Sequence, residues 1–186
     1  MRTGLAVLAL ILLVPLAGCG TGPTGAIREA TTPQSVDATV VEVIDGDTID
    51  VRYPDGETDR VRLLGVDTPE VHAATDPAEF EGVPDTAAGE ACLERAGRTA
   101  SQYLTERING SEITLRFDAL ADRRGSYGRL LAYVVHGGTN LNAALVATGH
   151  ARVYDSAFQA APRFYAAESR ARRNRSGLWR CVSVGS

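Results

Sequence analysis

Two short acidic segments carry residue types that suit phosphoryl chemistry. The first reads Asp-Gly-Asp-Thr at residues 45–48, and the second contains Asp67 and Glu70, shortly after Arg62. Carboxylates that meet at the ends of neighbouring strands can hold a hard cation, and an arginine beside them can hold a phosphate. We therefore expect these segments to form one site that acts on a phosphate group.

Strand patterns flank both acidic segments. Residues 41–44 are apolar and β-branched except for Glu42, residues 49–53 alternate between apolar and charged, and residues 60–63 alternate again after a Pro-Asp-Gly turn. Such runs predict an antiparallel meander. If Val61 and Leu63 fill the core, Arg62 lies on the opposite face of its strand and is available to a ligand.

Helical and strand patterns alternate through the rest of the chain. Apolar spacing, capping residues and glycines predict three helices, at residues 89–108, after Asn140, and from Pro162 to Gly177. Two further strands are expected at residues 113–117 and 130–135. These elements must pack around the meander and position its polar residues.

The N-terminal segment resembles an export signal. Arg2 precedes an apolar run at residues 5–16, which is shorter than the roughly 20 residues needed to span a bilayer. Small residues and Cys19 follow, in the pattern of a lipobox. We expect a signal peptide at residues 1–18 and a lipid on Cys19 that anchors the protein to the outer face of the cell membrane. The alternative is ordinary cleavage and secretion, with Cys19 as an unmodified thiol.

The expected organisation continues with a flexible tether at residues 19–36, one folded domain at residues 37–182 and a tail at residues 183–186. The formal net charge of −4 excludes binding of nucleic acid through an overall basic field. Any contact with a polyanion must therefore be local and assisted by a metal.

Several motifs together resemble the staphylococcal nuclease family, in order and at similar spacing. They are the segments at residues 45–48, 62–70, 127–133, 141–146 and 177–179. The resemblance covers residues 40–179. It implies an α+β, mainly β fold, a five-stranded OB-fold barrel with about three packed helices, and Ca²⁺-dependent cleavage of DNA and RNA. Taken alone, the motif at residues 45–47 is more often a turn than a metal site, and Arg62 is usually a solvated strand residue, so the inference rests on the coincidence of the motifs.

The resemblance implies a metal site of oxygen ligands. Asp47 and Asp67 would supply carboxylates and Thr68 its backbone carbonyl, a set that suits Ca²⁺ and not zinc. Asp45 resembles a neighbouring carboxylate that acts from outside the ligand shell.

The resemblance also implies the catalytic and substrate-binding residues. Glu70 would orient or deprotonate the attacking water, and Arg62 and Arg129 would grip the phosphate through bidentate contacts. Tyr127 matches a tyrosine beside the nucleotide phosphate. Tyr154 matches a tyrosine of the nucleotide pocket, although a one-residue shift in register leaves this match open.

Cys92 and Cys181 are the two cysteines outside the lipobox. In an exported protein such a pair favours a structural disulfide, here between the first helix and the C-terminal region; two buried thiols are the alternative.

The segment between Glu70 and Gly89 departs from the family pattern. It is acidic, containing Asp76, Glu79, Glu81 and Asp85. Negative charge beside the substrate groove is expected to weaken polynucleotide binding.

The sequence thus predicts an extracytoplasmic, monomeric, Ca²⁺-dependent nuclease that cleaves DNA, RNA or both on the 5′-oxygen side. A non-catalytic nucleic-acid or surface-binding module with an OB fold, and an envelope scaffold protein, are the alternatives. A non-catalytic relative would be expected to have lost some of the five expected site residues. All five are present in this sequence: Asp47, Arg62, Asp67, Glu70 and Arg129.

Overall fold

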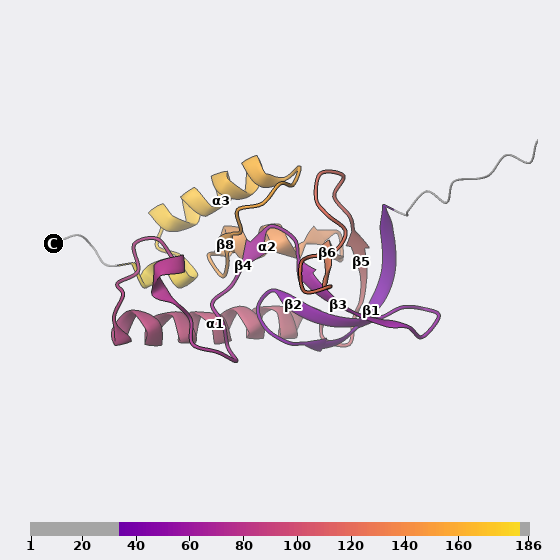
Figure 1. Ribbon diagram of the computed structural model, residues 1–186, viewed down its shortest axis with the longest axis horizontal. Coiled ribbons are helices and arrows are strands. Elements are labelled where there is room, and N and C mark those ends of the chain that lie inside the picture. Colours follow the sequence, from indigo (N-terminus) through magenta and orange to yellow (C-terminus); the bar gives the residue numbers. More distant parts are fainter. Residues whose placement is uncertain (1–33, 183–186) are drawn as a thin grey trace, which may run out of the picture. The chain divides into compact units, whose positions relative to one another are not determined.

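A five-stranded barrel forms the centre of the computed structural model, which describes residues 34–182 (Figure 1). Its strands are β1 (Ser35–Val43), β2 (Thr48–Arg52), β3 (Thr58–Leu63), β5 (Glu112–Arg116) and β6 (Leu130–His136). They are hydrogen-bonded in the order β3-β2-β1-β5-β6, with antiparallel neighbours. The parallel pairing of β3 with β6 closes the barrel. The predicted α+β OB-fold barrel is confirmed.

Three very short strands lie outside the barrel wall. β7 (Thr139–Asn140) extends the sheet beyond β6, and β4 (Val66–Asp67) pairs with β8 (Arg152–Val153) in a separate two-stranded sheet. β1 begins at Ser35, so the first strand includes two residues that the sequence assigned to the tether. The expected signal peptide and the lipidation site at Cys19 lie outside the described residues.

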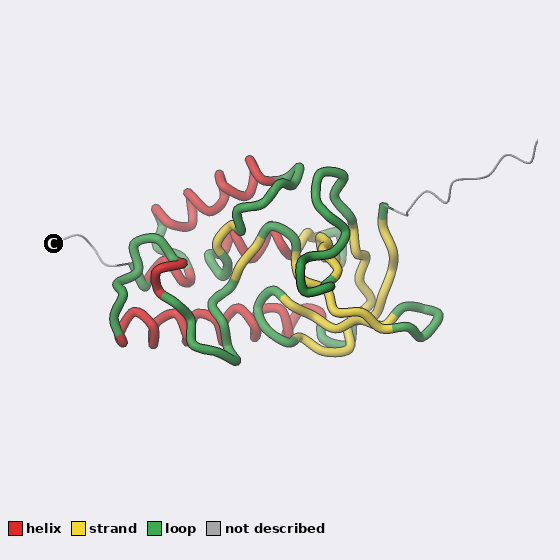
Figure 2. Tube along the Cα trace, viewed as in Figure 1, coloured by secondary structure: helices red, strands yellow, loops and turns green. Residues whose placement is uncertain are grey.

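Three α-helices pack around the barrel, α1 (Ala87–Ile108), α2 (Leu141–Thr148) and α3 (Ala161–Arg173). Figure 2 shows α1 and α3 along opposite sides of the view. α1 begins two residues before the predicted start because the Thr86 side chain caps it, accepting a hydrogen bond from the Gly89 amide at 3.2 Å. Between residues 34 and 182 no helix is long and apolar enough to cross a membrane.

The last helix is shorter than predicted. α3 ends at Arg173, and Gly177 opens a separate 3₁₀-helix, η2 (Gly177–Arg180). Arg175 has a φ of 52°, in the left-handed region, which ends the helical path before Gly177 is reached.

Residues 34–182 enclose two hydrophobic cores. The larger lies between the barrel, α1, α2 and α3, and the smaller joins Phe80, Val83, Leu93, Ala171, Leu178 and Trp179. The smaller core fixes the segment after Glu70, which contains the 3₁₀-helix η1 (Pro77–Glu79), against α1, α3 and η2. A disulfide between Cys92 and Cys181, whose Cα atoms are 5.7 Å apart, lies beside this core.

Loss of the disulfide is expected to destabilise the protein. The bridge closes a loop with a sequence separation of 89 residues, and the unfolded-chain entropy of such a loop predicts a loss of about 3–5 kcal/mol for a Cys92→Ser, Cys181→Ser double variant. Urea unfolding, compared with the parent before and after reduction, measures the loss. Labelling of Cys92 by a thiol reagent in the folded, unreduced parent would contradict the bridge.

Candidate active site

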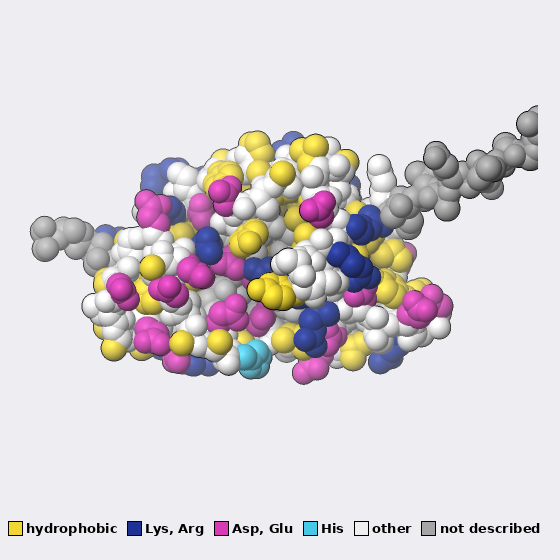
Figure 3. Space-filling model, in the orientation of Figure 1, with side chains coloured by type: hydrophobic (Ala, Val, Ile, Leu, Met, Phe, Trp, Pro, Cys, Tyr) yellow, Lys and Arg dark blue, Asp and Glu magenta, His cyan; other side chains and the backbone are white. Residues whose placement is uncertain are grey.

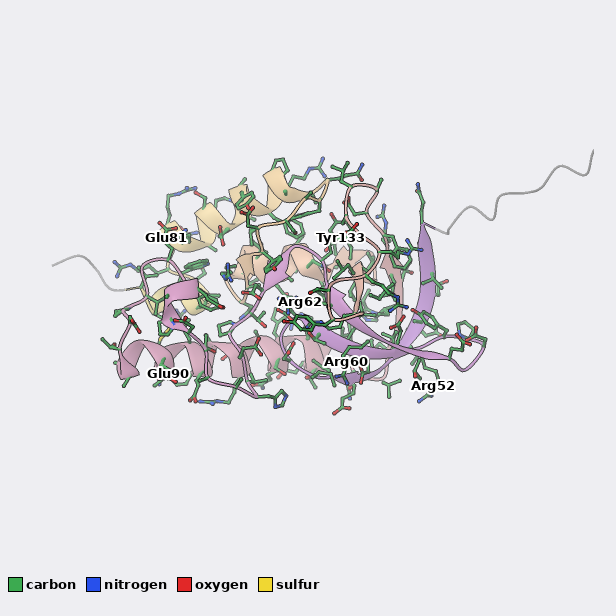
Figure 4. All side chains as sticks on the ribbon, in the orientation of Figure 1. Arg52, Arg60, Arg62, Glu81, Glu90 and Tyr133 are labelled. Carbon is green, nitrogen blue, oxygen red and sulfur yellow. A yellow bond between two sulfur atoms is a disulfide. The ribbon has the colours of Figure 1, made fainter. Side chains whose placement is uncertain are left out.

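Arg62 bridges the two acidic segments from strand β3. Its neighbours Val61 and Leu63 are fully buried in the barrel, so Arg62 points away from the core, as strand alternation predicts. Its Nη1 lies 2.7 Å from Asp47 Oδ1, and its Nη2 lies 2.5 Å from Asp67 Oδ1. With only 15% of its side chain exposed, Arg62 joins both carboxylates in one nearly buried cluster, near the centre of Figure 4.

Both carboxylate oxygens of Asp47 accept hydrogen bonds from neighbouring residues. Thr48 Oγ1 donates to Asp47 Oδ1 and the Thr68 amide donates to Asp47 Oδ2, both at 3.0 Å. Gly46 permits this close approach, because a Cβ there would lie 2.7 Å from Thr68 Oγ1 and from Ala100 Cβ. The turn at residues 45–48 is thereby fixed against the second acidic segment.

Burial, together with the charges of Asp45 and Asp67, raises the pKa of Asp47 to about 7, against the opposing effects of the Arg62 charge and of the hydrogen bond from the Thr68 amide. Asp45 lies next to Asp47, whose amide donates to Asp45 Oδ1 at 3.0 Å. A buried carboxylate beside like charges is costly unless a cation accompanies it. The cluster is thus short of positive charge even with Arg62 in place.

The donor chemistry of this cluster fits a hard cation. Asp47 and Asp67 offer carboxylate oxygens around a position that the Arg62 guanidinium now bridges, and the Thr68 peptide lies against Asp47. No group of three or more Asp, Glu, His or Cys side chains suited to a metal occurs within residues 34–182. Asp47 and Asp67 are therefore the pair of carboxylates that the cluster offers to a cation, and carboxylate oxygens are ligands that Ca²⁺ accepts together with backbone, water or substrate oxygens.

His72 is not part of this cluster. Its Nε2 lies 2.9 Å from the Ile44 carbonyl oxygen, so it is a loop residue whose ring contacts the backbone.

An open cleft of about 440 Å³ lies over Arg62 and Asp67, and Glu70, Arg129 and Tyr154 also line it. Glu70 is exposed, and its pKa is raised by partial burial and by the charges of Asp45 and Asp67, against the effect of Arg62 and Arg129. A raised pKa makes the carboxylate a better proton acceptor. The cleft therefore places a potential base beside two arginines.

Two tyrosines stand at the cleft. Tyr127 is 85% exposed, and Arg129 Cζ lies 5.6 Å from its ring centroid. Arg62 Cζ lies 5.8 Å from the ring centroid of Tyr154, which is also exposed. Both rings line the cleft and are exposed to solvent, and the match of Tyr154 to a nucleotide-pocket tyrosine stays a prediction.

Arg152 is a residue of the site that the sequence analysis missed. It lines the same cleft, and its Nη2 lies 2.7 Å from Asp67 Oδ2. The signal was local alternation: Ala151 and Val153 are buried, which places Arg152 and Tyr154 on the opposite face. Only the pairing of β8 with β4 brings that face to Asp67.

Only part of the acidic segment faces the cleft. Glu79 lines it, whereas Glu81 forms an ion pair with Arg172 of α3 at 2.8 Å and Asp76 caps η1 by accepting from the Ala78 amide. On the face of the molecule that Figure 3 shows, acidic and basic side chains are interspersed.

Glu79 is expected to oppose substrate binding. Its side chain is 57% exposed and lies 3.8 Å from Arg152 Nη2, so a Glu79→Gln variant should lower KM for single-stranded DNA about two- to fivefold, the scale of one exposed charge interaction. Glu81→Gln is the matched control, since it removes the same charge from the same segment outside the cleft. An equal fall in KM in both variants would contradict a specific effect of Glu79.

Comparison with known proteins identifies the family. The profile described as staphylococcal nuclease homologue matches residues 60–181, more than half of the chain. Uncharacterized protein MJ1439 of Methanocaldococcus jannaschii is 38% identical over 147 residues, which cover 75% of this chain and 70% of that protein. The SPbeta prophage-derived endonuclease YokF of Bacillus subtilis is 35% identical over 77% of this chain, which spans 44% of YokF. A thermonuclease of Staphylococcus intermedius is 30% identical over 82% of this chain and 80% of its own length. The chain therefore belongs to the staphylococcal nuclease family.

Proposed function

We propose that the protein is an extracytoplasmic, Ca²⁺-dependent nuclease that hydrolyses phosphodiester bonds of DNA, RNA or both. The observation that carries the proposal is the cluster in which Arg62 bridges Asp47 and Asp67 beneath a cleft that also holds Glu70 and Arg129. Family membership and relatives named endonuclease and thermonuclease support it.

Asp47, Asp67 and the carbonyl of Thr68 would hold the cation. Bound Ca²⁺ would neutralise charge on the phosphate and polarise its phosphorus–oxygen bonds. Because a phosphodiester repels an attacking hydroxide and gathers charge on its equatorial oxygens during attack, arginines around it lower the barrier. We assign this task to Arg129 and to Arg62 once Arg62 has left the carboxylates.

Glu70 would hold the attacking water and accept or share its proton, since it lines the cleft and its pKa is raised. Attack opposite the 5′-oxygen would give cleavage on that side, as the family resemblance implies. Tyr127 and Tyr154 would bind the nucleotide at the cleft through their exposed rings.

Incubation of the purified protein with single-stranded DNA and with RNA, in Ca²⁺ or in excess chelator, tests the proposal. Cleavage that requires Ca²⁺ is expected. Equal and negligible cleavage in both conditions, by a protein with an intact circular dichroism spectrum, would reject it. Binding of DNA without cleavage would instead favour the non-catalytic OB-type module.

The proposed location outside the cytoplasm rests on the disulfide, since such bonds persist mainly in oxidising compartments. A lipid on Cys19 and a monomeric state remain part of the proposal. Mass spectrometry of the protein extracted from membranes tests the first, and sedimentation equilibrium tests the second.

A further inference from the structure

The two carboxylate oxygens of Asp67 have different partners. Oδ1 contacts Nη2 of Arg62, and Oδ2 lies 2.7 Å from Nη2 of Arg152. Arg62 also bridges to Asp47, so it occupies the position between the two candidate metal ligands. Arg152 contacts the other oxygen of Asp67, and in the part of the chain that the structure describes no ion pair joins it to Asp47. A cation that enters between the carboxylates must therefore displace Arg62 but need not displace Arg152.

The backbone fixes Arg152 opposite Asp67. β4 and β8 are antiparallel, and Asp67 and Arg152 are direct partners in their register. β8 is in turn attached to α3, because the Val153 amide donates to Glu168 Oε1 at 2.8 Å. Residues directly opposite on an antiparallel pair have closely spaced side chains. The contact between Arg152 and Asp67 is thus part of the sheet geometry.

The segment that departs from the family pattern covers the other side of Arg152. The Cζ atom of Arg152 lies 5.2 Å from the ring centroid of Phe80, which is buried in the smaller core. The Nη2 atom of Arg152 lies 3.8 Å from Glu79. The side chain is only 22% exposed, and its Nε is buried without a hydrogen-bond partner among the described residues. The surrounding side chains therefore confine Arg152, and its contact with Asp67 leaves the buried Nε without a hydrogen bond to any residue that the structure describes.

We propose that Arg152 is a positioning residue for Asp67: it holds Oδ2 and so presents Oδ1 to the cation when Arg62 leaves. The proposal rests on the proposed Ca²⁺-dependent function and adds a residue to it. Groups that orient a metal ligand from behind commonly change metal affinity about 10- to 100-fold when they are removed.

Simple charge repulsion predicts the opposite sign. Arg152 is a cation close to a candidate cation site, so its removal would strengthen Ca²⁺ binding if it acted through its charge alone. A positioning role predicts weaker binding, because an unheld carboxylate must lose rotational freedom when it binds the metal. The direction of the change in Ca²⁺ affinity separates the two accounts.

The test measures Ca²⁺ affinity directly by isothermal titration calorimetry on the full chain and on the variants Arg152→Gln, Arg152→Lys and Arg60→Gln. Arg60→Gln is a matched control, since Arg60 and Asp50 are also direct partners on antiparallel strands and form an ion pair at 2.7 Å. We expect Arg152→Gln to weaken Ca²⁺ binding about 10- to 100-fold. Arg152→Lys should lie between Arg152→Gln and the parent, and Arg60→Gln should match the parent.

Turnover at saturating Ca²⁺ supplies the second readout. Because Arg152 acts through Asp67 and not on the substrate, kcat of both Arg152 variants should return to within a few-fold of the parent when Ca²⁺ saturates them. A kcat that stays far below the parent value at saturating Ca²⁺ would overturn the positioning role. Thermal unfolding without Ca²⁺ checks the fold, and Arg152→Lys alone decides the question if Arg152→Gln does not fold.

Failure of the inference is distinguishable from failure of the proposed function. A parent that cleaves with Ca²⁺ but whose Arg152→Gln variant binds Ca²⁺ as tightly or more tightly would overturn the inference alone. An equal loss in Arg60→Gln would also overturn it, because the effect would then not depend on the contact between Arg152 and Asp67. A parent that binds no Ca²⁺ would overturn both.

Discussion

Replacement of Glu70 by glutamine is expected to lower kcat for DNA cleavage by about 10²- to 10⁴-fold, the usual contribution of a positioned general base. Glutamine keeps the size and hydrogen-bonding capacity of the side chain but cannot accept the proton of the attacking water. Glu70 is exposed at the cleft and lies outside both cores. The fold and the KM should therefore change little, and single-turnover kinetics at saturating Ca²⁺ measure the effect.

The control for Glu70→Gln is Glu57→Gln, in the exposed hairpin between β2 and β3. It removes the same charge outside the cleft and should leave kcat unchanged. If Glu70→Gln retained full turnover while Arg129→Ala lost it, the water would be activated by another group and only the role of the arginine would stand.

The barrel strands and the direction of most of their polar side chains could be predicted, because alternation along a strand depends only on neighbouring residues. Val61 and Leu63 identify the buried face, and that alone fixes the direction of Arg62. The two ends of α2 could also be predicted, because the residues that determine them lie at the ends of the helix itself. The Asn140 side chain accepts from the Ala143 amide at 3.0 Å, and Gly149 adopts a φ of 76° that ends the helix.

Contacts between short segments that are distant in the sequence could not be predicted from such local patterns. Alternation at residues 151–154 indicates only that Arg152 lies opposite the buried side chains. The pairing of β4 with β8, two residues each, leaves no pattern in the sequence, so the contact between Asp67 and Arg152 could not be predicted. The smaller core was missed for a related reason. Phe80 is buried by contacts with residues of α1, α3 and η2, although its own segment has no apolar repeat.

The fully buried side chain of Asn142 is a third feature that the sequence does not reveal. It donates to the carbonyl oxygens of Leu64 and Ala132 and accepts from the Val134 amide, all within 3.1 Å. From the sequence alone, Asn142 is only one more residue of the helix predicted after Asn140. Its hydrogen-bond partners lie in β6 and in the segment after β3, which are outside the helix. Buried polar groups are recognised only when their partners are known.

Replacement of Arg62 by methionine should change catalysis and metal binding in opposite directions. Arg62 now forms ion pairs with Asp47 and Asp67, so it competes with any cation for the same oxygens. Methionine keeps much of the side-chain length without the charge. We expect Ca²⁺ affinity to rise, because the metal no longer has to displace a guanidinium and the two carboxylates attract it more strongly.

The same variant should lose kcat by about 10²- to 10³-fold, the scale of removing one group that stabilises transition-state charge. Calorimetry of Ca²⁺ binding and turnover at saturating Ca²⁺ measure the two effects separately. Arg124→Met provides a control of similar chemistry, since Arg124 pairs with Asp59 at 2.6 Å and does not line the cleft. Its Ca²⁺ affinity should equal that of the parent.

The opposite signs expected for Arg62 and Arg152 make the pair of variants more informative than either one. Both arginines contact Asp67, one at each carboxylate oxygen, and both would repel a cation by charge alone. If charge governed the site, both variants would bind Ca²⁺ more tightly. Tighter binding without Arg62 and weaker binding without Arg152 would require that the first occupies the metal position and the second orients its ligand.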